Sequence, residues 1–118
     1  MENKDYLRNR AYKFSLALIN LIDTLPNKRV CWVIGDQLLR SGMSIGANLI
    51  EGKAASSRLE YKKFFEIALK SANETKYWLH LLKDSQFGDN ADIEKLLSEA
   101  TEISNMIASG VIKLKSRL

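Results

Sequence analysis

The sequence predicts an all-α protein, an antiparallel up-down-up-down four-helix bundle. Apolar residues recur every three or four positions through four long segments, which is the spacing of one buried face on a helix. Short polar stretches separate these segments, and the chain offers no credible strand. Because short connections between long helices make consecutive helices antiparallel, we expect one domain over residues 1–118. Its helices should span about 5–24, 28–54, 58–83 and 91–116.

The first two helices are predicted from their apolar stripes and from the break between them. The stripe of the first helix consists of Leu7, Ala11, Phe14, Leu18, Leu21 and Leu25. Pro26 and Asn27 then break the chain, since proline disfavours a helical residue before it and asparagine is a good helix cap. The stripe of the second helix, which includes small and polar residues, is Cys31, Ile34, Leu38, Ser41, Ile45, Asn48 and Gly52.

The last two helices have clear starting signals. Ser57 and Glu60 have the S-x-x-E spacing of a capping box, which opens a helix. The stripe that follows is Tyr61, Phe65, Ala68, Ala72, Thr75, Leu79 and Leu82. Gly88 and Asn90 supply the turn and the cap before the fourth helix. The fourth stripe is Ile93, Leu96, Ala100, Ile103, Ile107, Val111 and Leu114.

Length and composition place the chain among ordinary globular proteins. A chain of 118 residues is long enough to fold without disulfides or metal, and its 46% hydrophobic and 27% charged residues are typical of soluble domains. The single cysteine, Cys31, cannot pair within the chain. We find no export signal and no segment long enough to span a bilayer, so we expect a cytoplasmic protein with no membrane contact.

A run of small and polar residues, RSGMSIGANLIEG at positions 40–52, interrupts the apolar second helix. A hairpin between the second and third helices would place Ser41 opposite Ser71 and Ser44 opposite Ala68. Both helices would then present small side chains at the same height. Close approach of the two backbones explains the glycines, which in a helix interior otherwise cost about 0.5 to 1 kcal/mol relative to alanine.

The polar residues in this run need partners, because an unpaired buried polar group costs about 1 to 3 kcal/mol. Arg40 lies within a turn of Glu74 on the hairpin, which predicts an ion pair with two parallel bonds. Asn48 and Glu51 are both expected to contact Arg8 or Tyr6 at the start of the first helix. We interpret the set as a structural polar network rather than a catalytic or ligand site: Arg40, Ser44, Asn48, Glu51, Ser71 and Glu74.

Two motifs carry a family resemblance. The runs QLLRSGMSIGANLIEG (37–52) and EYKKFFEIALKSANE (60–74) resemble the four-helix bundle family first described from intervening sequences of bacterial 23S rRNA genes, often labelled the S23 ribosomal protein family. The matching positions are Gln37, Arg40, Ser44, Ile45, Asn48, Glu51, Gly52, Glu60, Phe64, Ile67, Ala68, Ser71 and Glu74. Lys70 stands where the family pattern has glycine. The outer helices agree only in length and pattern.

The resemblance implies a ring of identical subunits, typically a homopentamer, and little enzymology. A related branch accompanies diversity-generating retroelements, where the accessory protein works with a reverse transcriptase and nucleic acid. The second and third helices also carry apolar residues outside their main stripes. Such wide apolar faces indicate contact with two neighbouring helices of the bundle, whereas aromatic residues left at the surface would mark a subunit interface. The residues are Trp32, Leu39, Met43, Ile50, Phe64, Ile67, Trp78 and Leu81.

Basic residues gather at one end of the predicted bundle, although the formal net charge is only +4. Such a surface suits the phosphate backbone of RNA or DNA through counterion release, without reading bases. The candidate nucleic-acid-binding residues are Lys4, Arg8, Arg10, Lys53, Arg58, Lys62, Lys63, Lys113, Lys115 and Arg117. The alternative is a purely structural or protein-binding oligomeric scaffold, in which this end is merely solvated.

Catalytic and metal-binding motifs are not found in the sequence. A di-iron bundle requires Glu-x-x-His pairs on two helices, and the only histidine, His80, follows Tyr77, Trp78 and Leu79. No phosphate-binding loop, dinucleotide fingerprint or nucleophile elbow is present. We therefore predict no enzyme activity, cofactor, metal or small-molecule substrate, and interpret Cys31 and His80 as packing residues.

Overall fold

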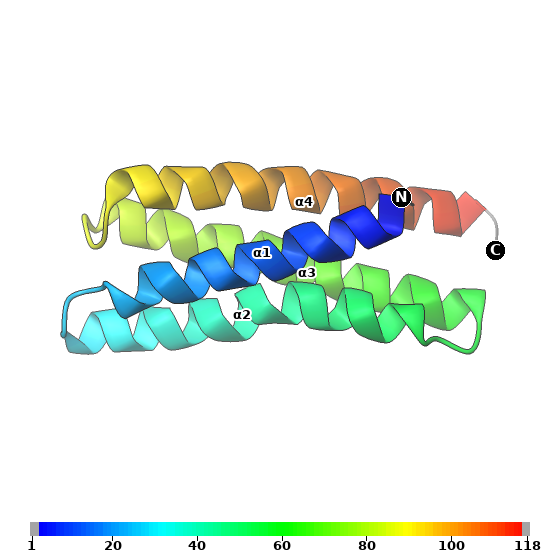
Figure 1. The fold of residues 1–118 in the computed structure, drawn as a ribbon, viewed down its shortest axis with the longest axis horizontal. Coiled ribbons are helices and arrows are strands. Elements are labelled where there is room, and N and C mark those ends of the chain that lie inside the picture. Colours follow the sequence, from blue (N-terminus) through cyan, green and yellow to red (C-terminus); the bar gives the residue numbers. More distant parts are fainter. Residues whose placement is uncertain (1–2, 117–118) are drawn as a thin grey trace.

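The computed structural model describes the backbone of residues 3–116 and the side chains of residues 5–116. Its elements are the helices α1 (Asn3–Asp23), α2 (Arg29–Lys53), α3 (Arg58–Asp84) and α4 (Asn90–Ser116). They run alternately up and down in a rod of 46 × 22 × 20 Å (Figure 1). The predicted four-helix bundle is confirmed, and the helix ends lie within two residues of the expected ones.

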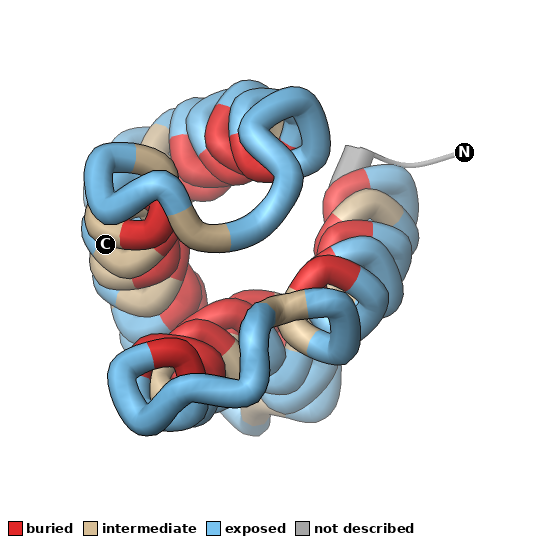
Figure 2. Tube along the Cα trace, turned by 90° about the vertical axis from the view of Figure 1, so that its left-hand side faces the viewer, coloured by how far each residue is buried: buried red, intermediate tan, exposed pale blue. Residues whose placement is uncertain are grey.

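The predicted apolar stripes form one core. The buried face of each helix turns toward the centre of the bundle (Figure 2). Almost every stripe residue is buried, and only Leu25, Asn48 and Tyr61 are half-buried. Leu49, which lies outside the predicted stripe, is also buried. The free thiol of Cys31 is in this core and is only 2% exposed.

The start of α3 forms as its sequence predicts. The Ser57 hydroxyl accepts a hydrogen bond from the backbone N–H of Glu60 at 3.1 Å. The Glu60 carboxylate in turn accepts from the backbone N–H of Ser56 at 3.2 Å, one residue earlier than in the usual capping box. The backbone N–H groups of Ser56 and Glu60 at this helix end therefore have acceptors within the chain.

The two predicted asparagine caps are wrong. The side-chain oxygen of Asn27 accepts from the indole N–H of Trp32 at 2.9 Å, and α2 begins without a side-chain cap. Before α4, the carboxylate of Asp89 accepts from the backbone N–H of Asp92 at 3.0 Å, so the cap is one residue earlier than Asn90. At α2 the indole of Trp32 engages the Asn27 side chain, and at α4 the neighbouring Asp89 takes the capping position.

Glycines let α1 lie close to α2. A Cβ atom at Gly42 would overlap the side chain of Leu18, which is completely buried. One turn further along, a Cβ atom at Gly46 would be 3.5 Å from the Cβ of Ala11, an ordinary van der Waals contact. The close approach expected from the small residues of α2 therefore occurs toward α1 as well as toward α3.

Candidate functional site: the polar seam and the basic end

A row of hydrogen-bonded polar side chains, the polar seam, joins α2 and α3. The hydroxyls of Ser41 and Thr75 are 2.9 Å apart, and both residues are completely buried. The Ser71 hydroxyl donates to the Ser44 hydroxyl at 2.9 Å, and the Asn48 amide donates to the same oxygen at 2.9 Å. These bonds satisfy polar groups that tight packing removes from water.

The predicted register between α2 and α3 is wrong by about one helical turn. Ser41 does not face Ser71, and Ser44 faces Ser71 instead of Ala68. The connection between the two helices runs extended through Ser57. The first turn of α3 therefore lies further along the bundle axis than the last turn of α2, which shifts the register. A shift of one turn keeps the same side chains on the shared face, so the small-residue contact survives.

The predicted ion pair between Arg40 and Glu74 forms. Only one guanidinium nitrogen reaches Glu74, because Arg40 also donates twice to the side-chain oxygen of Gln37, at 3.1 and 2.8 Å. Glu74 additionally accepts from the indole N–H of Trp78 at 2.9 Å. Because Arg40 is 57% exposed, its ion pair contributes little to the free energy of unfolding. These contacts mainly order the side chains on the surface of α2 and α3.

The predicted contacts of Asn48 and Glu51 with the start of α1 are wrong. The Asn48 amide turns back along its own helix and bonds the residue one turn earlier. Glu51 is exposed, and the guanidinium of Arg8 donates to Asp5 at 3.1 Å. The polar network therefore links α2 to α3 and does not extend to α1.

The start of α1, the α2–α3 connection and the end of α4 meet at one end of the rod (Figure 1). We call this the basic end. Four of its cations are exposed and form no ion pair with any other described residue. They are Arg58, Lys63, Lys113 and Lys115.

The remaining candidate cations differ from these four. Lys62 is 16% exposed and bonds Glu66 at 3.3 Å, so its stem packs against the bundle. Arg8 and Lys53 both contact Asp5, at 3.1 and 3.9 Å. Of the residues proposed from the sequence, the side chain of Lys4 and the whole of Arg117 lie outside the described residues.

Arg10 clamps α1 to α4, a contact that sequence reasoning missed. Its side chain is 17% exposed and donates to Glu99 at 2.8 Å, with Glu102 at 3.3 Å. The hydrogen bond with Glu99 raises the pKa of Arg10 above its ordinary value. The two glutamates lie three residues apart on α4, but this spacing does not identify Arg10 as their partner. Arg10 is therefore an internal contact rather than a free cation of the basic end.

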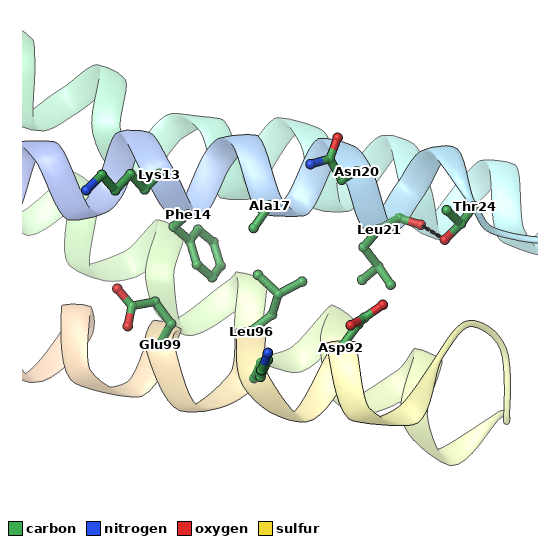
Figure 3. A pocket seen from close by; sticks show the side chains of 10 residues that line it. Lys13, Phe14, Ala17, Asn20, Leu21, Thr24, Asp92, Leu96 and Glu99 are labelled. Carbon is green, nitrogen blue, oxygen red and sulfur yellow. Dashed lines mark hydrogen bonds between the residues drawn. The ribbon is translucent and has the colours of Figure 1, made fainter.

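A groove of about 570 Å³ lies between α1 and α4 (Figure 3). Phe14, Ala17 and Leu96 form its apolar floor, and charged side chains, among them the Glu99 held by Arg10, form its rim. None of the described candidate nucleic-acid-binding or polar-network residues lines it. Over residues 5–116, no group of three or more His, Cys, Asp or Glu side chains could hold a metal.

His80 is exposed, so its interpretation as a packing residue is wrong, whereas Cys31 is buried as expected. None of the four helices, as far as they are described, combines the length and the apolar character needed to cross a bilayer.

The fold and site together define a class: small four-helix bundle proteins with a polar seam between the central helices and a basic end. The chain belongs to the 23S rRNA-intervening sequence protein family, whose model matches residues 5–109. This confirms the family resemblance carried by the two motifs. A similar crystal structure is that of a protein of unknown function from the S23 ribosomal protein family of Bacteroides thetaiotaomicron. It is 34% identical, with a TM-score of 0.87, over 93% of this chain and 98% of that chain. The comparison with curated proteins gave no match.

Proposed function

We propose that the chain forms a noncatalytic homo-oligomer that binds the phosphate backbone of RNA or DNA through its basic end. The observation that carries this proposal is the set of four exposed cations without ion-pair partners: Arg58, Lys63, Lys113 and Lys115. A ring of five subunits and a cytoplasmic location are part of the proposal. In a ring, the basic ends would repeat around one face and add their potentials.

The geometry favours contact with phosphates rather than with bases. The cations lie at the ends of α3 and α4, on side chains that extend into solvent. Ser57 already occupies the backbone N–H of Glu60 at the N-terminus of α3, so we assign phosphate binding mainly to the side-chain charges. Binding of this kind tolerates any sequence and weakens steeply with salt.

Reversing two of these charges tests nucleic-acid binding. The double variant Lys63→Glu with Lys113→Glu should bind a short mixed-sequence RNA or DNA more weakly than the wild type. Its log–log salt dependence should be shallower by about 0.7 to 0.9 for each phosphate that the protein no longer neutralises. Lys62 stays unchanged because its stem is half-buried and it bonds Glu66. The measurement is fluorescence anisotropy over a salt series.

A matched control reverses two cations that lie away from the basic end. Lys70 and Lys95 are exposed and form no ion pair with another described residue. The variant Lys70→Glu with Lys95→Glu has the same net charge as the test variant and should keep more of the affinity. Equal losses in the two variants, or wild-type binding that does not respond to salt, would contradict a site at the basic end.

An exposed apolar surface supports the oligomer. On α2, the side chains of Trp32, Met43 and Ile50 are 58, 42 and 56% exposed, and their spacing places them on one face of the helix. Tyr12, Leu16 and Ile19 form a similar exposed stripe on α1. Ile19 and Trp32 line the same groove between these helices, so the two stripes adjoin. We call these six residues the apolar face; surfaces of this kind mark protein–protein contacts.

The double variant Ile19→Glu with Met43→Glu should dissociate the oligomer, because it introduces two charges into the apolar face. Both side chains are exposed in the single chain, so the helical content and thermal stability of the subunit should change little. Size-exclusion chromatography with light scattering measures the mass. The control is Ile112→Glu on α4, which alters a residue that is 68% exposed and away from this face. A monomeric wild type would refute the oligomer.

The second candidate function is a protein-binding or structural scaffold without a nucleic-acid role. The apolar face favours it, since such a surface contacts proteins whatever the basic end does. The two functions make different predictions. A scaffold would lose mass in the Ile19→Glu with Met43→Glu variant, yet show no salt-sensitive binding of RNA or DNA.

A further inference from the structure

At the edge of the basic end, two cations from different helices share a single carboxylate oxygen. The guanidinium Nη1 of Arg8 on α1 is 3.1 Å from Oδ1 of Asp5, and the ammonium of Lys53 at the end of α2 is 3.9 Å from the same oxygen. The cluster therefore holds two positive charges against one negative charge. It brings together the first turns of α1 and the last turn of α2.

The Arg8 side chain is only 12% exposed, and its hydrogen bonds are incomplete. Its Nε is buried and has no hydrogen-bond partner, and its one hydrogen bond among the described residues is the single contact with Asp5. A guanidinium has five N–H donors in a planar fork that matches a phosphate or a carboxylate through two parallel bonds. Asp5 therefore leaves most of the N–H donors of Arg8 without an acceptor.

Asp5 is a weakly held anion. Its side chain is 52% exposed, and its contact with Arg8 is a pair three residues apart on one helix, a class of ion pair that contributes little to stability. Lys53 is 65% exposed and free to move on its flexible stem. A backbone phosphodiester has the same single charge as a carboxylate, but its neighbouring phosphates engage the other cations of the basic end at the same time, so it can take the place of Asp5 between the two cations.

We propose that Arg8 and Lys53 form a phosphate site for the nucleic-acid backbone, and that Asp5 is an internal competitor for this site. The inference rests on the proposed function and deepens it, because it assigns a residue that lowers affinity. Phosphate binding would move the Asp5 side chain into solvent and give the Arg8 fork a bidentate partner. The four free cations of the basic end would then act together with this site.

The test is Asp5→Asn in the full chain, with binding of a short mixed-sequence RNA measured by fluorescence anisotropy across a salt series. The variant should bind about 3- to 10-fold more tightly at low salt, with a log–log slope steeper by about 0.7 to 0.9. Inorganic pyrophosphate serves as the competitor. It should displace the RNA only at concentrations far above the RNA Kd, since a single site lacks the other contacts along a backbone.

Two further variants keep the test decisive. Asp23→Asn removes the same charge from the exposed far end of α1 and should leave the affinity near the wild-type value. Adding Lys53→Gln to Asp5→Asn should cancel part of the gain. Equal gains from Asp5→Asn and Asp23→Asn would overturn the site, because net charge alone would explain them. Displacement by pyrophosphate as effective as displacement by unlabelled RNA would overturn the assignment to a nucleic-acid backbone.

Failure of this inference is distinguishable from failure of the proposed function. If the wild type binds RNA in a salt-dependent manner and Asp5→Asn does not change that binding, the phosphate site at Arg8 and Lys53 is refuted and the basic end stands. If the wild type shows no salt-dependent binding of RNA or DNA, the proposed function itself is refuted, and this site with it.

Discussion

Replacing Gly42 with alanine is expected to destabilise the bundle by about 1 to 3 kcal/mol, even though alanine is the better helix former. The added Cβ would overlap the side chain of Leu18, which lies completely buried in the core. Relief requires Leu18 to leave its rotamer or α1 to move away from α2, and tightly packed interiors resist both. Urea denaturation followed by circular dichroism measures the change in the free energy of unfolding.

Gly46→Ala is the matched control, since it makes the same substitution one turn along the same helix. There the new Cβ would meet the Cβ of Ala11 at 3.5 Å, which is ordinary contact. This variant should be neutral or more stable by up to about 1 kcal/mol, because alanine removes the entropic penalty of glycine. If both variants change stability in the same direction and by the same amount, close packing at Gly42 is not the reason for its glycine.

Thr75→Val is expected to lower the free energy of unfolding by about 1 to 3 kcal/mol, because it leaves the completely buried hydroxyl of Ser41 without its hydrogen-bond partner. Ser41→Ala should cost less, about 0.5 to 1.5 kcal/mol, since Thr75 keeps its bond to the carbonyl of Ser71 at 2.7 Å. The double variant should cost less than the sum of the two single variants, because it leaves neither hydroxyl without its partner. Equilibrium unfolding of all four proteins completes this cycle.

The control for this cycle is Thr101→Val on α4. The Thr101 hydroxyl bonds the carbonyl of Leu97 at 2.8 Å within its own helix, but the residue is exposed. Removing this hydroxyl should change stability by no more than about 0.5 kcal/mol. Strictly additive effects of Ser41→Ala and Thr75→Val would show that the two hydroxyls are not energetically coupled across α2 and α3.

The local structure was predictable because each signal lies within a few residues of its effect. The stripe that contains Phe14 and Leu18 requires only helical spacing, and Ser57 and Glu60 adopt the cap that their separation favours. The caps of α2 and α4 were less predictable. Asp89 and Asn90 are adjacent and both suit a helix start, so the choice depends on tertiary context.

Properties that depend on the relation between helices could not be predicted in the same way. The register of α2 and α3 follows from the backbone path of their connection, so Ser44 meets Ser71 rather than Ala68. The clamp between Arg10 and Glu99 joins residues that are 89 positions apart, and no local pattern ties them. Arg40 and Glu74 were predictable despite the register error, because long charged side chains span a turn.

The single thiol of the chain can serve as a native probe of opening motions. Cys31 is 2% exposed and lies near the start of α2, beside the groove that α2 forms with α1. A thiol-specific reagent can reach its sulfur only when the two helices separate locally or the chain unfolds. The modification rate therefore reports how often this end of the bundle opens, and no label or added cysteine is needed.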